Sequence, residues 1–285
     1  MVHYIENDKL TLGVKEFGCE IASIKSKATG YEFMWQGNPD IWGGQAPILF
    51  PIVGRLIDDK YTLGGKEYEM PKHGFARKMP WEFLGADDNS MSFRLSDTAE
   101  TREIYPFEFD LTVTYTLEDT TLVVSHDIKN KGENTMYFSL GAHPAFNCKI
   151  GDVLTFDENE TLYTEKIDLV KSLRLSEKIL VLDNEKDIVV TKDVFNEDAL
   201  ILSDIKSENI TLNLSEGEKK IRFNLGGAPY LGIWAKPGAP YVCIEPWYGV
   251  NDSQVKKDDF SQKDAINPVA AGETFNFTWK AEFSE

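Results

Sequence analysis

The sequence predicts an all-β protein, built as a single large antiparallel β-sandwich. Short stretches in which apolar and polar residues alternate dominate the chain, and few stretches show a helical period. No linker rich in Pro, Gly or Ser interrupts the pattern, so we expect residues 1–285 to form one domain. With 42% apolar and 12% aromatic residues, a chain of 285 residues can bury the core that such a domain needs.

Alternation predicts the first strands at residues 9–14, 20–26 and 31–36. Residues 61–68 follow the pattern of a tight β-hairpin, because the pair Gly64-Gly65 supplies the backbone freedom of its turn.

The segment from Trp42 to Leu56, WGGQAPILFPIVGRL, cannot form a regular central strand. Pro47 and Pro51 have no backbone N–H to donate to a neighbouring strand. Burial of this apolar run would hold Arg55 rigidly, either as a surface cap on a strand end or as a clamp on a substrate hydroxyl or phosphate.

Clear alternation returns at residues 107–117 and 122–128. His126 shares a face with the apolar residues of its strand, and we interpret it as a structural residue. The next predicted strand ends at His143, since Pro144 pushes the residue before it toward extended geometry. A histidine at such a strand end can meet a ligand, or its ring can be satisfied by backbone in a sheet corner.

The pattern weakens from residue 151 to 192, where we expect short helices or long loops with a solvated exterior. Residues 210–214 and 221–225 then predict a hairpin, and residues 274–283 predict the last strand.

Charge and cysteine content exclude several classes of protein. The chain has 30 Lys and Arg against 47 Asp and Glu, a formal net charge of −17, which disfavours nucleic acid and anionic membranes as partners. The three cysteines are far apart and never form a CxxC motif, so we expect no disulfide framework, no zinc site and a cytoplasmic location. No apolar run reaches the ~18 residues of a membrane span.

One basic cluster stands out against this acidic background. Lys72, His73, Arg77 and Lys78 lie within seven residues of each other in the sequence KHGFARK. The cluster is either a solvated loop or a local site for an anionic group.

Motifs for nicotinamide, nucleotide, acyl-hydrolase and zincin chemistry are absent: the chain has no GxGxxG, GxxxxGK[ST], GxSxG or HExxH. The remaining candidates for chemistry are strand-end histidines, strand-end acids and an arginine, accompanied by tryptophans. They are His73, His143, Asp198, Glu245 and Arg55, with Trp234 and Trp247. Aromatic rings near carboxylates favour a sugar ligand, whose C–H face packs on the ring while its hydroxyls form charged hydrogen bonds.

Two reactions of sugars suit these side chains without a cofactor. Glycoside hydrolysis normally needs two carboxyl groups that flank the bond. Interconversion of anomers needs a base for the C1 hydroxyl and an acid for the ring oxygen, roles that a carboxylate and a histidine can fill.

Five motifs, in order over nearly the whole chain, resemble those of the aldose 1-epimerase (galactose mutarotase) superfamily. They are FPIVGRL (50–56), KHGFAR (72–77), GAHPAF (141–146), EDALIL (197–202) and CIEPWYG (243–249). The resemblance is to the branch that contains LacX-type and hexose-6-phosphate 1-epimerase-like proteins. It implies a supersandwich fold and an isomerase that needs neither metal nor cofactor.

The resemblance also implies roles for individual residues. Glu245 would be the base at the C1 hydroxyl and His143 the acid at the ring oxygen, while His73 and Arg55 would hold and polarise the sugar. Asp198 would bind a ring hydroxyl, although the classical mutarotases have a different residue where this chain has Ala199.

A second departure from the classical mutarotases is the Arg of the HGFAR motif. Arg77, together with Lys72, could bind a phosphate, or Arg77 could pair with one of the nearby acids, which is the arrangement we expect.

From these residues and the resemblance, the leading function is a cytosolic hexose mutarotase. The alternatives are a hexose-6-phosphate 1-epimerase, a carbohydrate-binding or sugar-sensing protein without turnover and, more distantly, a glycoside hydrolase.

Overall fold

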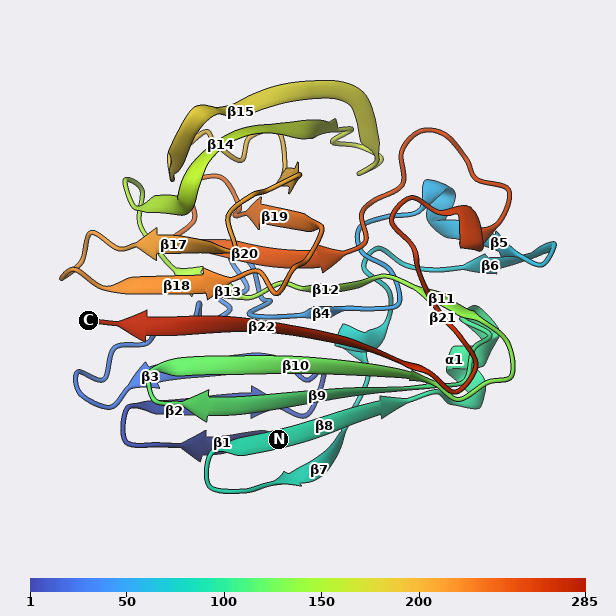
Figure 1. Ribbon diagram of the computed structural model, residues 1–285, viewed down its shortest axis with the longest axis horizontal. Coiled ribbons are helices and arrows are strands. Elements are labelled where there is room, and N and C mark those ends of the chain that lie inside the picture. The colour runs from blue at the N-terminus through green and yellow to red at the C-terminus, as the bar shows by residue number, and fades with distance from the viewer.

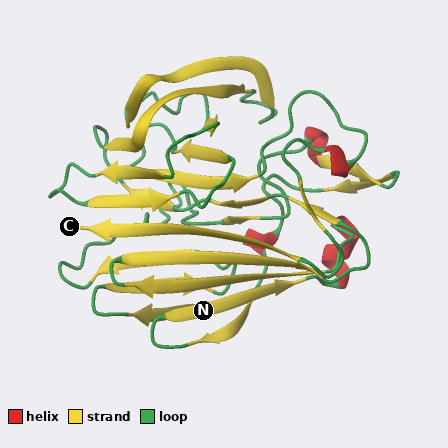
Figure 2. Cartoon of the chain, in the orientation of Figure 1, coloured by secondary structure: helices red, strands yellow, loops and turns green.

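The computed structural model describes residues 1–285 and is built almost entirely of β-strands (Figure 2). The helices are short: α1 (Ala99–Ile104) and three 3-10 turns at Ile57–Asp59, Ala76–Lys78 and Phe260–Gln262. None of them has the length and hydrophobicity that a membrane crossing requires.

One 15-stranded sheet runs through the molecule, and all its pairings are antiparallel (Figure 1). Its strands, in spatial order, are β4 (Ile48–Leu49), β12 (Leu140–Ala142), β20 (Tyr241–Tyr248), β19 (Tyr230–Trp234), β16 (Leu200–Ser203), β14 (Val153–Ile167), β17 (Asn209–Asn213), β18 (Lys220–Asn224), β22 (Thr274–Ser284), β10 (Thr121–Asn130), β9 (Phe109–Glu118), β8 (Ser90–Ser96) and β7 (Glu82–Ala86). Two further strands join this path, β13 (Ala145–Asn147) beside β20 and β15 (Arg174–Val189) beside β14.

Three small sheets complete the fold. They are β1 (Val2–Glu6), β2 (Leu10–Lys15) and β3 (Ile21–Ser26); β5 (Lys60–Leu63) and β6 (Lys66–Glu69); and β11 (Met136–Phe138) with β21 (Asn267–Val269). The three-stranded sheet packs against the large one: the Tyr115 hydroxyl on β9 donates a hydrogen bond to the carbonyl of Cys19, 2.6 Å away, and both residues are buried. This two-layer arrangement confirms the predicted β-sandwich.

Alternation determines which face of the central strands is buried. On β9 every second residue from Phe109 to Leu117 is buried, and the residues between them are partly exposed. His126 on β10 lies on the buried face and stacks on Phe277, with ring centroids 5.4 Å apart. Burial lowers the pKa of His126 to about 4, so the ring is neutral in the core, as its structural interpretation requires.

The segment 151–192 corrects one expectation. In place of helices or loops it forms the two longest strands, β14 and β15, a hairpin that arches over the top of the sheet in Figure 1. The register of the hairpin shifts several times, and Ser176 to Leu180 on β15 are all exposed, so β15 lacks the alternation of a half-buried strand. Residues 31–36 also differ from expectation, since they form only isolated bridges.

The proline-rich segment behaves as predicted, because only Ile48 and Leu49 pair as a strand, β4. Strand β12 lies between β4 and β20, with Gly141 opposite both Leu49 and Trp247. Within the large sheet, this arrangement brings the end of β12 beside the middle of β20. The predicted hairpins at 61–68 and 210–225 and the last strand are confirmed as well.

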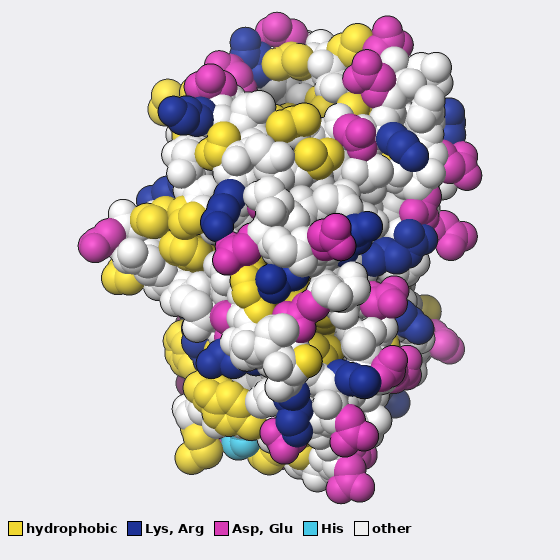
Figure 3. Space-filling view, turned by 90° about the vertical axis from the view of Figure 1, so that its left-hand side faces the viewer, with side chains coloured by type: hydrophobic (Ala, Val, Ile, Leu, Met, Phe, Trp, Pro, Cys, Tyr) yellow, Lys and Arg dark blue, Asp and Glu magenta, His cyan; other side chains and the backbone are white.

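The surface carries its negative charge in dispersed form. Figure 3 shows one face, where Lys and Arg side chains are interspersed with Asp and Glu and form no continuous basic patch. A basic ligand surface of the kind that nucleic acid needs is not visible on this face.

Candidate active site

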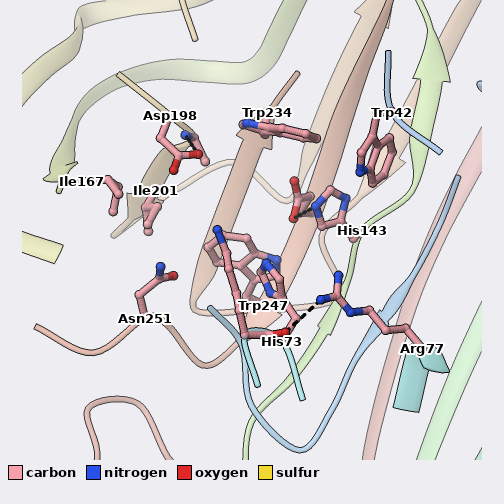
Figure 4. Close-up of a pocket in the computed structure, with 13 residues that line it drawn as sticks. Trp42, His73, Arg77, His143, Ile167, Asp198, Ile201, Trp234, Trp247 and Asn251 are labelled. Atoms are coloured by element: carbon pink, nitrogen blue, oxygen red, sulfur yellow. Dashed lines mark hydrogen bonds and ion pairs between the residues drawn. The ribbon is translucent and has the colours of Figure 1, made fainter. Parts of the chain in front are cut away.

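A histidine and a glutamate meet where β12 ends beside β20. His143 is the first residue after β12, and Glu245 lies in the middle of β20. Their side chains approach to 3.3 Å between His143 Nε2 and Glu245 Oε2, and the exposed fractions of the two side chains are 10% and 1%. Both line a cavity of about 240 Å³, which Figure 4 shows in close-up.

Burial favours the neutral form of each partner. Loss of water raises the pKa of Glu245 well above its usual range, and the nearby Asp198 charge adds to the rise. The indole of Trp247 and the Lys72 ammonium offset part of it, although the indole N–H makes no hydrogen bond of normal geometry. Neither oxygen of Glu245 has a hydrogen-bond partner in the protein, so both are free for a ligand.

The pKa of His143 shifts in the opposite direction. Burial, together with the positive charges of Arg77 and Lys72, lowers its pKa to about 3. Its ring stacks on Trp42, with centroids 5.2 Å apart, and meets the edge of Trp234 at 5.8 Å. Because burial shifts the two pKa values in opposite directions, the pair holds a single proton over a wide pH range.

His73 comes from the tight turn before the Ala76–Lys78 segment, where the backbone adopts φ +65°. Gly74 follows at φ +68°, and a side chain there would place its Cβ 2.2 Å from the carbonyl oxygen of Phe50. The Nδ1 atom of His73 accepts a hydrogen bond from the Gly54 amide at 3.1 Å. Because Nδ1 is an acceptor and burial lowers the pKa, His73 is neutral, carries its proton on Nε2 and can donate a hydrogen bond to a ligand.

Arg77 and Lys72 both line the cavity, and neither forms an ion pair. The expectation that Arg77 pairs with a nearby acid is wrong, because its Nη2 donates to the Lys72 carbonyl at 2.9 Å and its buried Nε has no partner. The turn that presents His73 also lets Arg77 donate back to the backbone of the same segment.

Asp198, Trp234 and Trp247 are brought to the same cavity as predicted. Asp198 lies just before β16 with φ +78°, and its Oδ1 accepts the amide N–H of Ala199 at 2.8 Å, which fixes the turn. Figure 4 shows Asp198 across the cavity from Arg77. The two indoles come from neighbouring strands, Trp234 at the end of β19 and Trp247 on β20.

Arg55 is the exception among the predicted site residues, and its proposed role as a clamp in this cavity is a correction. Its guanidinium does not line the cavity and forms a two-pronged ion pair with Asp59, at 2.7 and 2.9 Å. The side chain is 35% exposed. Asp59, four residues further along the chain, therefore satisfies this arginine.

Besides Ala199, the neighbour of Asp198, sequence reasoning missed four residues that line the cavity: Trp42, Ile167, Ile201 and Asn251. Trp42 directly precedes Gly43-Gly44 in the loop before β4, so the sequence did contain a sign that this ring lies on a loop. The other three carry no local signal, because distant segments bring them to the cavity.

Residues that could bind a metal ion include His143, Glu245 and Cys243, whose ligand atoms lie within 4.8 Å of one another. Burial raises the pKa of the Cys243 thiol well above its ordinary value, whereas thiolate is the form that binds metals. The donor set therefore fits a metal ion poorly.

A second cavity, of about 490 Å³, shares Asp198 and Ala199 with the first. It is lined by residues of the β14–β15 hairpin and of the segment that follows it, most of them aliphatic or acidic, together with Thr164, Lys166 and Thr191, and it has neither a histidine nor an aromatic ring. The acid and base pair and the rings that suit a sugar are confined to the first cavity.

Comparison with known proteins identifies the family of the chain. The family model for aldose 1-epimerase matches residues 1–263. Protein LacX (plasmid) from Lactococcus lactis subsp. lactis is 31% identical over 280 residues, covering 93% of each chain.

Two solved structures superpose closely. The galactose mutarotase related enzyme from Lactobacillus acidophilus has a TM-score of 0.94 and 33% identity, covering 100% of this chain and 98% of its own. A galactose mutarotase-like protein from Lactobacillus casei ATCC 334 gives 0.94 and 31%, with full coverage of both chains. From the fold, the site and these matches together, the chain belongs to the aldose 1-epimerase family of isomerases.

Proposed function

We propose that the protein interconverts the α and β anomers of a hexose, with Glu245 as the base and His143 as the acid. The observation that carries the proposal is the buried contact of 3.3 Å between the two side chains, in a cavity lined by three tryptophans. One group accepts a proton while the other donates one, as opening a sugar ring requires. Because the lining residues run from Trp42 to Asn251, we also infer that the chain acts as a single domain.

In the ring-opening step, the Glu245 carboxylate takes the proton of the C1 hydroxyl. The C1–O5 bond breaks as the C1 carbonyl forms, and O5 takes the proton of the His143 imidazolium. The open-chain aldehyde then rotates about C1–C2, and O5 attacks the other face of the carbonyl while both protons return. The sugar gains and loses no atoms or electrons.

The pair must be ionic before ring opening and neutral after it. Burial in the cavity favours the neutral form of both side chains, since it raises the pKa of Glu245 and lowers the pKa of His143. Sugar hydroxyls bound beside the pair supply the hydrogen bonds that stabilise the ionic form. One proton passing over 3.3 Å then prepares the site for the reaction.

The remaining residues of the cavity would bind and orient the sugar. His73 donates from Nε2, Asp198 accepts from a hydroxyl, and the indole of Trp247 offers a surface for the C–H face of the ring. None of these groups has to change its protonation state during the reaction.

The experiment that tests the proposal follows anomer exchange by NMR for a panel of hexoses, each started from one pure anomer. We expect the protein to speed exchange of at least one hexose above its spontaneous rate. A saturable binding isotherm without any acceleration would show that the protein is a carbohydrate-binding or sensing protein and would overturn the proposal.

A hexose 6-phosphate is the second candidate substrate, favoured by the free charges of Lys72 and Arg77 in an otherwise acidic protein. If His143 addresses O5, the neighbouring C5 carries C6 toward the side of the cavity where Figure 4 shows Arg77. A guanidinium and an ammonium there could bind the phosphate oxygens.

The two candidates differ in how Arg77→Met affects them. If the substrate is phosphorylated, KM for the hexose phosphate is far below that for the free hexose, and the variant or added salt removes the difference. If the free hexose is the substrate, both sugars saturate at similar concentrations in the wild type and in the variant.

A further inference from the structure

Asn251 presents an unused hydrogen-bonding group to the cavity. It lies in the loop after β20, lines the cavity and is 6% exposed. Its Nδ2 donates to the Ser172 carbonyl at 2.8 Å, which fixes the orientation of the amide because only the nitrogen can donate. Oδ1 accepts no hydrogen bond from the protein, so it is left as an acceptor for a hydroxyl.

A buried cation holds the backbone of Asn251 in place. Arg174, itself 8% exposed, donates from Nε to the Asn251 carbonyl at 2.7 Å. The carboxylates of Glu165 and Asp264 bind the other two nitrogens of this guanidinium. Such a network keeps a side chain in one position, as a binding group requires.

The backbone at Gly54 leaves room for the amide. Gly54 has φ +72°, and a Cβ built on it would lie 2.0 Å from Oδ1 of Asn251. Any other residue at position 54 would displace the amide, so the FPIVGRL segment and the loop after β20 fit each other here.

The position of Asn251 determines which part of a sugar it can reach. Figure 4 shows Asn251 on the side of the cavity away from His143 and Arg77, near Ile167 and Ile201. In a pyranose the C3–C4 bond lies opposite the O5–C1 bond. If Glu245 and His143 address the C1 hydroxyl and O5, the C3–C4 edge points toward Asn251.

We infer that Asn251 is a specificity-determining residue whose Oδ1 accepts a hydrogen bond from the hydroxyl on C3 or C4 of the hexose. The inference rests on the proposed function, because it uses the orientation that the acid and base impose. With Asp198, it makes the enzyme sensitive to the presence and configuration of these hydroxyls, while the apolar side chains between them accept the C–H groups.

The test compares wild type and Asn251→Ala on the best hexose and on its 2-, 3- and 4-deoxy analogues, by NMR exchange. Loss of one neutral hydrogen bond should cost the wild type about 3- to 10-fold in kcat/KM on the 3-deoxy or the 4-deoxy sugar. The variant should lose about the same factor on the parent hexose and nothing further on that analogue, while the 2-deoxy sugar costs both proteins equally.

Asn213→Ala is the matched control, because Asn213 lies on β17, outside the cavity, and should leave every ratio unchanged. Asn251→Ser, whose hydroxyl is too short to span the gap, is the second variant should the alanine variant fail to fold. Equal losses in wild type and variant on all three analogues would overturn the inference. Failure of the wild type to exchange any hexose would instead overturn the proposed function.

Discussion

His143 Nε2 and Glu245 Oε2 lie 3.3 Å apart, and burial shifts the pKa values of these two groups away from each other. The Glu245 carboxyl keeps its proton at pH values above its usual pKa. The His143 imidazole gains a proton only as the pH falls to about 3. Between these limits the pair carries one proton, which is the number that the proposed reaction needs.

The pH dependence of kcat/KM should reflect this shared proton. At low pH the pair gains a second proton and loses its base, and at high pH it loses the only proton and with it the acid. Because the pKa of His143 is lowered to about 3, activity above the spontaneous rate should persist on the acid side well below pH 6.5. A profile with an acid limb centred at the ordinary histidine value would contradict the shared-proton account.

Removal of the acid should slow exchange without unfolding the protein. His143→Ala should lower kcat by about 10²–10⁴-fold, the usual contribution of a general acid. His126→Ala is the control for a buried histidine: it removes the packing on Phe277 and lowers Tm, but the folded variant should keep its kcat. If His143→Ala instead lowered Tm and left kcat intact, His143 would be a structural residue.

Arg55 and Arg77 should differ in their importance for the substrate. Arg55→Ala removes an ion pair whose side chains are 35% and 41% exposed, so it should change stability by less than ~1 kcal/mol and KM only slightly. Arg77→Met removes a charge that lines the cavity and should raise KM for any substrate that carries a phosphate. Steady-state kinetics on both variants decide the point, and a large rise in KM for Arg55→Ala would restore Arg55 to the site.

Stability should depend on pH through Glu245. Since its folded pKa is raised, the carboxyl stabilises the fold fully below its unfolded pKa of about 4.5, and this contribution is lost as pH rises toward the folded value. Within that window the free energy of unfolding of Glu245→Gln should rise relative to that of the wild type by about 1.4 kcal/mol for each pH unit. Thermal melts at pH 5 and pH 8 measure this, with exposed Glu282→Gln as the control. An equal offset at both pH values would show that Glu245 ionises freely in the fold.

Much of the fold could be predicted because a strand that buries only one face shows this in its own sequence, as alternation of apolar and polar residues. Strands β9, β10 and β22 each bury one face, so their sequences alternate. The β14–β15 hairpin could not be predicted, because β15 pairs on one side only and exposes residues on both faces.

The site residues also fall into those with a local sequence signal and those without one. His143 and Glu245 each precede a proline, which marks a strand end or an irregular strand, and this local signal was readable. Asn251 became visible only in the structure, because Arg174, 77 positions earlier in the chain, holds its backbone. The ion pair of Arg55 with Asp59 was equally hidden, since an arginine next to an apolar run fits a clamp and a surface cap alike.

The measurement that tests the central claim most directly is NMR exchange between anomers catalysed by wild type and by Glu245→Gln, together with calorimetric binding of the same hexose. An amide has the shape of the carboxyl group but cannot take the C1 proton. We therefore predict that the variant binds the sugar with an affinity near that of the wild type and leaves exchange at the spontaneous rate. Exchange at the wild-type rate in the folded variant would contradict the role of Glu245 and, with it, the proposed mechanism.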